Sequence, residues 1–456
     1  MSEIYYNPQE YVRQLQSLLI SDKKKIGFLF GAGTSLALKK DASNKSRVPA
    51  ICELTKSIVE KISIIEKDEN GNDKENKNKT ALENIKTELE ENEIDFNIEY
   101  ILSNVIQKKE IIGNGELNGL KKEGFNELEK QIKNEIREKV SVHRNKNEEF
   151  FLDNLIHTDF AEWVGRADRK NPIEIFTTNY DFLFELGLEH KNIPYYDGFV
   201  GGFDPFFDAL SVENSKFSPH CTKLWKIHGS LGWTFDKQRE KVLRKSPEDI
   251  KGKDILVYPS ILKYSEAKKF PYISLTDRLS NLLKQDDTVL FICGYSFGDS
   301  HINEVILSAL KTNTTSHVFV LFYDEYKEKV EEQETIKYSL QKDSILAKIA
   351  KETKKISVYG MRNAVIGGVF GEWKLKNEPD KEDTININLY FDEDAAIDEN
   401  ATVSTERSKT AENQPTSQVK GKENWTGKGK FILPDFAKFV NFLTSMIINN
   451  NEELRK

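Results

Sequence analysis

The stretch that decides the fold reads IGFLFGAGTS and runs from Ile26 to Ser35. Its first half, Ile26 to Phe30, is a short apolar run typical of a buried strand, and it stops at Gly31-Ala32-Gly33. Glycine allows a ligand to approach the backbone closely, and the start of a following helix favours anions. The stretch predicts a strand that runs into a phosphate-facing turn, although an ordinary strand-to-helix turn explains these glycines equally well on their own.

A second segment, TTNYD at Thr177 to Asp181, follows another mostly apolar run at Ile173 to Phe176. Polar side chains at the carboxyl end of a strand point into the ligand crevice of an open parallel sheet. Thr178, Asn179 and Asp181 are therefore candidate site residues. Helix capping is the alternative, and for Thr178 or Asp181 taken alone it is the better explanation.

A third segment, IHGS, places His228 at the end of the apolar run Leu224 to Ile227, directly before a Gly-Ser turn. A single histidine is usually structural. One that stands at a strand end before glycine is better placed for acid-base chemistry, so His228 is a candidate catalytic residue.

A fourth segment, GYSFGDSH, follows the β-branched and aromatic run Val289 to Cys293. Gly294, Ser296 and Asp299 can hydrogen-bond a ribose or an adenine edge, while turn chemistry explains each of them equally well singly. Four strand ends that each carry a polar turn are much harder to explain by turns alone. Together they predict a nucleotide pocket with chemistry at one end.

Apolar strand candidates recur along the second half of the chain, with amphipathic stretches between most of them. They lie at Leu224 to Ile227, Ile255 to Tyr258, Val289 to Cys293, Val318 to Phe322 and Ile356 to Tyr359. This alternation predicts an α/β fold with a doubly wound, Rossmann-like parallel sheet rather than a sandwich or a barrel.

The domain organisation follows from changes in composition. We expect a nucleotide-binding domain at 1–374, with a helical insertion at about 60–168 that begins with a polar loop, Glu66 to Lys79. Residues 375–428 read as a flexible polar linker with one edge strand at Ile385 to Phe391, and 429–456 as a C-terminal helical segment.

The four segments in this order resemble the sirtuin-like family, in its bacterial antiphage-defence branch. The resemblance covers about Ile26 to Tyr323, apart from the insertion. It implies that NAD is the substrate and that the domain is an NAD glycohydrolase, or NADase, acting as an abortive-infection effector. It also implies regulation by assembly, as a homo-oligomer or with a HerA-type ATPase partner.

The resemblance assigns roles residue by residue. Carried over by motif, these are Gly31, Ala32, Gly33 and Ser35 at the pyrophosphate, Asn179 and Asp181 beside the nicotinamide ribose, His228 as the catalytic histidine, and Gly294, Ser296 and Asp299 at the adenosine half. The polar cluster after the second strand adds Thr178 to the nucleotide-binding residues. Asn179, Asp181 and His228 are the expected catalytic set.

The cysteines separate this chain from the protein-deacylating sirtuins, which carry a four-cysteine structural zinc site. Only Cys52, Cys221 and Cys293 occur, each isolated, so neither that zinc site nor a disulfide framework can be built and no metal is expected. Two alternatives to hydrolysis stay open: an NAD-dependent deacylase or ADP-ribosyltransferase, and a non-catalytic scaffold or sensor that binds NAD or ADP-ribose.

Composition narrows the partners. The 456 residues have a formal net charge of −8, which gives no basic footprint, so direct binding of nucleic acid is not expected. The amino terminus lacks a secretory apolar core, and no apolar run approaches the roughly 18 residues of a membrane span. Unpaired cysteines fit a reducing compartment. We therefore expect a cytoplasmic protein with no membrane partner.

Overall fold

A computed structural model describes residues 3–39, 47–65, 76–166, 169–214, 217–236, 238–246, 271–330, 333–379, 385–394 and 425–447. The chain divides into two compact units. Unit 1 comprises residues 1–21 and 319–442, and unit 2 comprises residues 22–318 and 443–456. The predicted strand at 255–258 and most of the predicted linker at 375–428 lie outside the described residues.

The central element of unit 2 is a parallel sheet with the strand order β10-β2-β3-β7-β4. Its strands are β2 (Lys25–Phe30), β3 (Glu174–Thr177), β4 (Tyr195–Tyr196), β7 (Thr222–Lys226) and β10 (Thr288–Cys293). The apolar runs before the first, second, third and fourth motifs thus form strands as predicted. The α/β fold class with a Rossmann-like parallel sheet is confirmed.

Helices cover both faces of this sheet. Successive residues of β2 point to opposite faces and contact different helices. Phe28 and Phe30 make edge-to-face ring contacts with Phe160 of α7 (Ile156–Gly165), and Phe30 stacks on Phe184 of α8 (Leu183–His190). On the other face, a Cβ at Gly27 would lie 2.6 Å from Leu282 Cδ2 of α11 (Tyr272–Leu283). The sheet is therefore buried on both sides, as parallel sheets usually are.

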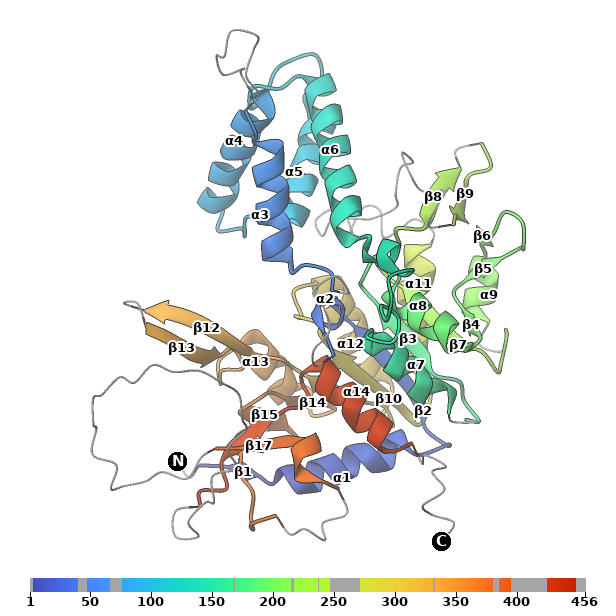
Figure 1. Cartoon of the computed structure of the whole chain (residues 1–456), viewed down its shortest axis with the longest axis vertical. Helices are drawn as coiled ribbons and strands as arrows, with labels where there is room; N and C mark the ends of the chain where they lie inside the picture. Colours follow the sequence, from blue (N-terminus) through green and yellow to red (C-terminus); the bar gives the residue numbers. More distant parts are fainter. Residues whose placement is uncertain are drawn as a thin grey trace. The chain divides into compact units, whose positions relative to one another are not determined.

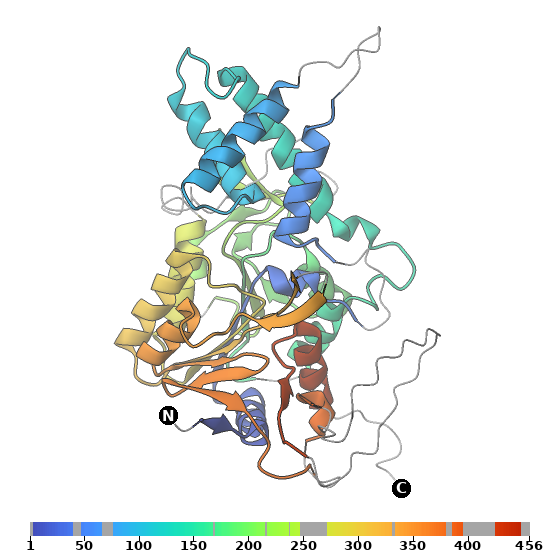
Figure 2. The same cartoon turned by 90° about the vertical axis from the view of Figure 1, so that its left-hand side faces the viewer.

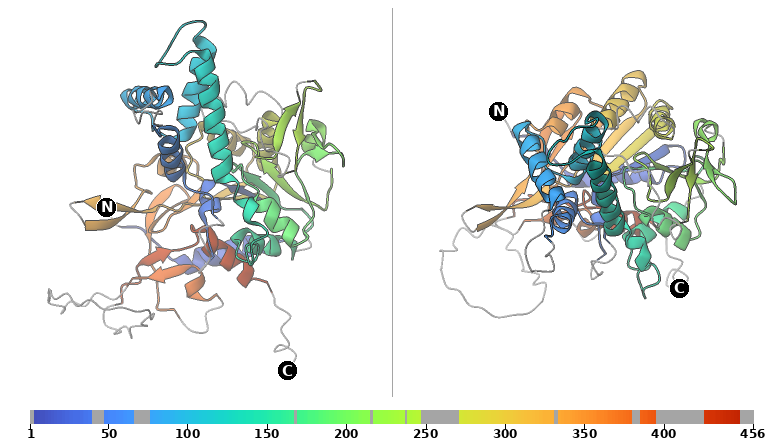
Figure 3. Two further views of the ribbon diagram at one scale, coloured as in Figure 1. Left: turned by 45° about the horizontal axis from the view of Figure 1, so that its top comes forward. Right: turned by 90° about the horizontal axis from the view of Figure 1, so that it is seen from above.

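Four further helices of unit 2 stand side by side as a bundle (Figures 1 and 2). They are α3 (Ile51–Ile62), α4 (Lys77–Glu91), α5 (Ile98–Ile111) and α6 (Lys122–Val140). At 19 residues α6 is the longest, and Figure 3 shows it extending along the bundle. Asn97 begins α5 by accepting hydrogen bonds from the backbone of Glu99 and Tyr100.

The apolar core of this bundle does not end at the helices. It is one cluster of buried side chains that also includes Leu183, at the start of α8, and Leu231, just after the third motif. Tyr180 and Phe182 pack against the same cluster. The helical bundle is therefore built directly onto two of the turns that leave the sheet.

The remaining described elements of unit 2 are short apart from one helix. They are α2 (Ala32–Leu36), η2 (Val142–Asn145), β5 (Phe199–Val200), β6 (Phe206–Phe207), α9 (Ala209–Glu213), β8 (Trp233–Asp236), β9 (Lys241–Arg244) and the longer α12 (Ser300–Thr312). Strands β5, β6, β9 and β8 form a small antiparallel sheet in that order.

Unit 1 contains strands in the order β1-β16-β15-β14-β11. Their bounds are β1 (Tyr5–Tyr6), β11 (His317–Leu321), β14 (Ile356–Tyr359), β15 (Asn363–Ile366) and β16 (Val369–Trp373). The other elements are α1 (Pro8–Leu19), the hairpin β12 (Glu325–Val330) and β13 (Gln333–Tyr338), and α13 (Ile345–Glu352). The predicted strands at 318–322 and 356–359 are confirmed by β11 and β14.

The carboxyl-terminal part of the described chain differs from the edge strand expected at Ile385 to Phe391. A 3-10 turn, η4 (Ile387–Leu389), lies in the middle of that segment, because Asn386 caps it by accepting a hydrogen bond from the backbone of Asn388. The strand begins only at Phe391, as β17 (Phe391–Glu393), and pairs antiparallel with β18 (Gly429–Phe431). Helix α14 (Phe436–Ser445) follows.

Within the described ranges, no helix has both the length and the apolar character that a membrane crossing requires.

Candidate active site

Four strands of unit 2 end at the same level. The register pairs Phe30 of β2 with Cys293 of β10 on one side and with Thr177 of β3 on the other, and Thr177 pairs with Lys226 of β7. All four motifs therefore leave the sheet at one edge. The strand order changes direction between β10 and β2, and open α/β sheets bind ligands at such a switch point.

The turn after β2 packs directly against the turn after β10. The backbone N–H of Gly33 donates to the carbonyl of Gly294 over 2.9 Å, and a Cβ at Gly31 would lie 2.4 Å from that same oxygen. Gly294 itself has φ +68°, in the left-handed region that favours glycine. The close approach of the two turns thus explains these glycines within the protein itself. Ala32 begins α2, and a pyrophosphate role for this turn stays a prediction.

Asn179 links the turn after β3 to the turn after β2. Its Nδ2 lies 2.7 Å from Ser35 Oγ, 3.1 Å from Thr34 Oγ1 and 3.1 Å from the carbonyl of Gly31. The side chain is 6% exposed. No described residue donates a hydrogen bond to Asn179 Oδ1, so this end of the amide can accept one from a ligand.

Asp181 has two partners within the protein. Ser35 Oγ donates to Oδ2 over 2.6 Å, and the backbone N–H of Leu183 donates to Oδ1 over 3.0 Å. Leu183 is the first residue of α8, so one carboxylate oxygen satisfies a helix terminus as the capping interpretation predicts. The other oxygen completes the cluster that Asn179 and Ser35 form.

His228 lies beside an acidic partner that its motif does not contain. Its Nε2 is 3.0 Å from Asp299 Oδ2, and both side chains are about one-tenth exposed, at 11% and 9%. Asp299 Oδ1 meanwhile accepts from the backbone of His301 and Ile302 and caps α12. A carboxylate beside an imidazole orients the ring and stabilises its protonated form. The structure thus adds a histidine contact to the adenosine role predicted for Asp299.

Two other predicted residues make turn contacts. Ser296 Oγ accepts from the backbone N–H of Gly298 over 3.3 Å. The backbone N–H of Thr178 donates to the carbonyl of Phe30 over 3.0 Å, and its side chain is half-buried. These contacts agree with turn chemistry, so a nucleotide contact by either residue stays a prediction.

One side chain of the TTNYD turn contacts the helical bundle. The hydroxyl of Tyr180 donates to Glu99 Oε1 of α5 over 2.9 Å. Burial, and then the charge of Glu99, raise the pKa of Tyr180 well above its ordinary value, so the phenol stays protonated and donates. Tyr180 stands between Asn179 and Asp181, and the bundle therefore contacts the candidate catalytic turn directly.

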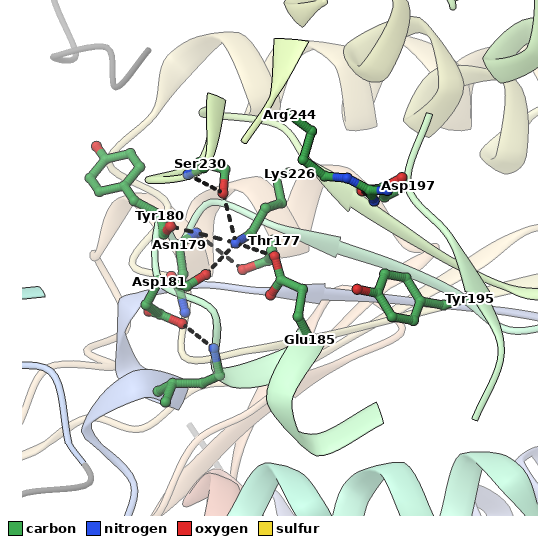
Figure 4. A network of polar contacts seen from close by, with 12 residues as sticks. Thr177, Asn179, Tyr180, Asp181, Glu185, Tyr195, Asp197, Lys226, Ser230 and Arg244 are labelled. Atoms are coloured by element: carbon green, nitrogen blue, oxygen red, sulfur yellow. Dashed lines mark hydrogen bonds and ion pairs between the residues drawn. The ribbon is translucent and has the colours of Figure 1, made fainter. Parts of the chain in front are cut away.

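A buried lysine forms a second polar network at this edge, which the sequence analysis missed (Figure 4). Lys226, the last residue of β7, is 4% exposed, and its Nζ lies 2.6 Å from Glu185 Oε1. Burial raises the pKa of Glu185 although Lys226 opposes the shift. A charged residue inside the apolar run at 224–227, directly before the histidine motif, was the signal in the sequence.

Comparison with known proteins fits this geometry. Residues 173–346 match the family model described as a SIR2-like domain. The matched span begins at β3 and includes Asn179, His228 and Asp299, while the turn at Gly31 lies before it. No curated protein matches the chain. The chain therefore contains a sirtuin-like domain, of a class whose members bind NAD and are commonly NAD-dependent enzymes.

Proposed function

We propose that the protein is an NAD glycohydrolase that converts NAD and water to nicotinamide and ADP-ribose. The observation that carries this proposal is the hydrogen-bonded cluster of Asn179, Asp181 and Ser35 at the same sheet edge as the His228–Asp299 pair. An amide with an accepting oxygen, a carboxylate and an oriented imidazole are the groups that a hydrolysis at ribose requires.

The reaction places few demands on an acid. The bond between ribose C1′ and the nicotinamide nitrogen already has a cationic pyridinium as its leaving group, so the electron pair leaves with neutral nicotinamide. The positive charge then moves to an oxocarbenium-like ribose, which water attacks while losing one proton. Enzymes accelerate such steps by stabilising that charge and positioning the water, as in glycoside cleavage.

Each group of the cluster has a role in this scheme. Asn179 Oδ1 accepts a hydrogen bond from the attacking water or a ribose hydroxyl. The carboxylate of Asp181 stabilises the developing cation, and its two bonds to Ser35 and Leu183 hold it in place. His228 takes the proton, a contribution of about 10²- to 10⁴-fold in comparable sites, and Asp299 stabilises the imidazolium that results.

Transfer to an acceptor other than water is the competing chemistry. The chain has three cysteines, too few for the four-cysteine zinc site of the protein-deacylating sirtuins. Among the described residues, no group of His, Cys, Asp and Glu side chains is arranged to hold a metal ion. The missing cysteines favour water as the acceptor.

We place this activity in antiphage defence, where depletion of NAD aborts infection. Constant hydrolysis would harm the host, so activity depends in this proposal on assembly, as a homo-oligomer or with a HerA-type ATPase. The direct contact of Tyr180 with Glu99 supports such control, because it offers a route from the bundle surface to the catalytic turn. Full activity from a dilute monomer without any partner would contradict the regulatory part.

A competition experiment tests the acceptor. Purified protein, with and without the ATPase, is incubated with NAD in the presence and absence of an acetyl-lysine peptide, and the products are separated by chromatography. A hydrolase releases the same amounts of nicotinamide and ADP-ribose in both mixtures. A deacylase forms O-acetyl-ADP-ribose only when the peptide is present, and a non-catalytic binder leaves NAD intact.

A further inference from the structure

We propose that Lys226 is a positioning residue of this site: its ammonium group holds the turn after β3 and the turn after β7 in one fixed arrangement. The catalytic meaning of this inference rests on the proposed NAD hydrolysis. The geometry that carries it does not, because every contact involved lies within the protein.

The contacts of Lys226 reach both turns. From the first turn, Nζ donates to the carbonyl of Asp181 and lies 3.5 Å from the carbonyl of Tyr180. From the second turn it lies 3.3 Å from Ser230 Oγ, two residues beyond His228. The ammonium also lies 5.0 Å from the ring centroid of Phe182. Figure 4 shows the amino group between Tyr180 and Asp181 of the first turn and Ser230 of the second.

The residues that Lys226 holds are neighbours of the proposed catalytic groups. The two carbonyls belong to the residue after Asn179 and to Asp181 itself. One further bond joins the same two turns, because the backbone N–H of Leu231 donates to the carbonyl of Tyr180 over 3.0 Å. Without the ammonium group, the hydrogen bond from Leu231 to Tyr180 would still join the two turns, but the charged contacts would be lost.

Neutralisation of Glu185 is the purely structural explanation for a buried lysine, and it accounts for only one of these contacts. A buried charge is expensive unless it is paired and hydrogen-bonded. An ammonium has three donors, and here Glu185 accepts one while carbonyl and hydroxyl oxygens of the turns surround the rest. Positioning and pairing can therefore be separated by mutation.

The test compares Lys226→Met with Glu185→Gln. Methionine matches the length of the lysine stem and removes all the donors. Glutamine at 185 removes the charge of the partner and leaves Lys226 its contacts with both turns. The inference predicts that Lys226→Met lowers kcat for NAD by about 100-fold with a much smaller change in KM, since a misplacement of the order of 1 Å costs about that much. Glu185→Gln should retain most of the wild-type kcat.

Hydrogen exchange gives a second readout that does not depend on turnover. In Lys226→Met, the amides of Asn179, Leu183 and Leu231 should exchange faster than in Glu185→Gln, because they report on the two turns. If Lys226→Met does not fold, Lys226→Gln is measured instead, since its amide keeps two donors and should show an intermediate loss.

The outcomes separate the two proposals. A wild-type protein that never cleaves NAD contradicts the proposed function, and exchange then still tests the role of Lys226. An active wild type with an equally active and equally protected Lys226→Met protein overturns the positioning inference. So does a Glu185→Gln protein that loses kcat and protection as strongly as Lys226→Met, because pairing would then be the whole role.

Discussion

His228 Nε2 and Asp299 Oδ2 lie 3.0 Å apart, although 70 residues separate the two in the chain. The same carboxylate caps α12 through its other oxygen. One side chain thus fixes the start of a helix and the orientation of the proposed catalytic imidazole. His228 follows β7, whereas Asp299 follows β10. The position of the imidazole ring therefore depends on how these two strands are placed in the sheet.

Asp299→Asn separates the two duties of this carboxylate. Asparagine caps helices as well as aspartate does, so the melting temperature should change little. The amide carries no charge to stabilise an imidazolium and can donate to Nε2, so kcat should fall by roughly 10²-fold. Steady-state kinetics with NAD measure the effect, and thermal unfolding checks that the cap is intact. Unchanged kcat in Asp299→Asn would show that the pair is structural.

Asn179→Asp tests the donating end of the amide, which holds Asn179 in the cluster with Ser35. Aspartate is nearly isosteric and keeps an acceptor, yet it cannot donate to Ser35 Oγ or to the carbonyl of Gly31. We expect the loss of nearly all turnover and a fall in the free energy of unfolding of about 1–3 kcal/mol, because buried acceptors lose their donor. Chemical denaturation and kinetics on the same protein measure both. A variant that is destabilised but fully active would show that Asn179 has no role in the reaction.

The Tyr180–Glu99 hydrogen bond should couple the helical bundle to the site. Tyr180→Phe and Glu99→Gln each remove or weaken one bond, worth about 1.5–3 kcal/mol when a charged group accepts it. In a double-mutant cycle the combined variant should be little worse than either single variant, in stability and in kcat. Strict additivity would mean that the two side chains act independently.

The glycines of the two packed turns should tolerate no side chain. Gly31→Ala places a Cβ 2.4 Å from the carbonyl oxygen of Gly294 and 2.6 Å from Tyr295 Cα, both backbone atoms. Overpacking of this kind costs about 1–3 kcal/mol, and thermal unfolding measures it. Gly202→Ala is the matched control, since no heavy atom lies within 4 Å of its Cβ. Equal melting temperatures for the two variants would contradict the packing account.

Buried histidines should make stability depend on pH. Burial lowers the pKa of His157 to about 3 and that of His143 to about 4, where neighbouring charges from Arg144 and Lys226 add to the effect. The unfolded chain binds these protons near the ordinary pKa of about 6.5 and the folded chain does not. The stability from the neutral rings is therefore complete above that pH and is lost as the pH falls, down to about 4 for His143 and about 3 for His157.

His157→Phe tests this dependence while it keeps a ring against Phe184, whose centroid lies 4.6 Å away. Between pH 6.5 and 4, the slope of unfolding free energy against pH should be smaller in the variant by about 1.4 kcal/mol per pH unit, the value for one proton. Urea titrations over this range measure the slope. An identical slope in both proteins would show that His157 is protonated in the folded state.

Much of the sheet could be predicted from the sequence because its signals are local. The run IGFLF at 26–30 and the runs before TTNYD and GYSFGDSH are short, apolar and stopped by turn residues, and each forms a strand of the sheet. The motif residues stand at strand ends for the same reason. The sequence also indicated a helical insertion at about 60–168, and α4, α5 and α6 lie within that range.

The contacts that assemble the site could not be predicted, because they join residues distant in sequence. Asp299 caps its own helix locally, which hides its partner His228. Glu99 lies in a stretch with helical patterning, and nothing in that pattern indicates a hydrogen bond with Tyr180. Lys226 lies in an apolar strand. A lysine there suggests an edge strand or a solvent-exposed position, and only the structure shows that the strand is buried. At Asn386, a local cap overrode an alternation that favoured a strand.

The most direct test of the central claim is the stoichiometry of products from NAD. Wild-type protein and His228→Ala are incubated with NAD, alone and with the HerA-type ATPase, and nicotinamide and ADP-ribose are quantified over time. The account predicts equal release of both products by the wild type in at least one condition and none by His228→Ala, at unchanged thermal stability. Intact NAD in every condition, or equal turnover by the two proteins, would contradict it.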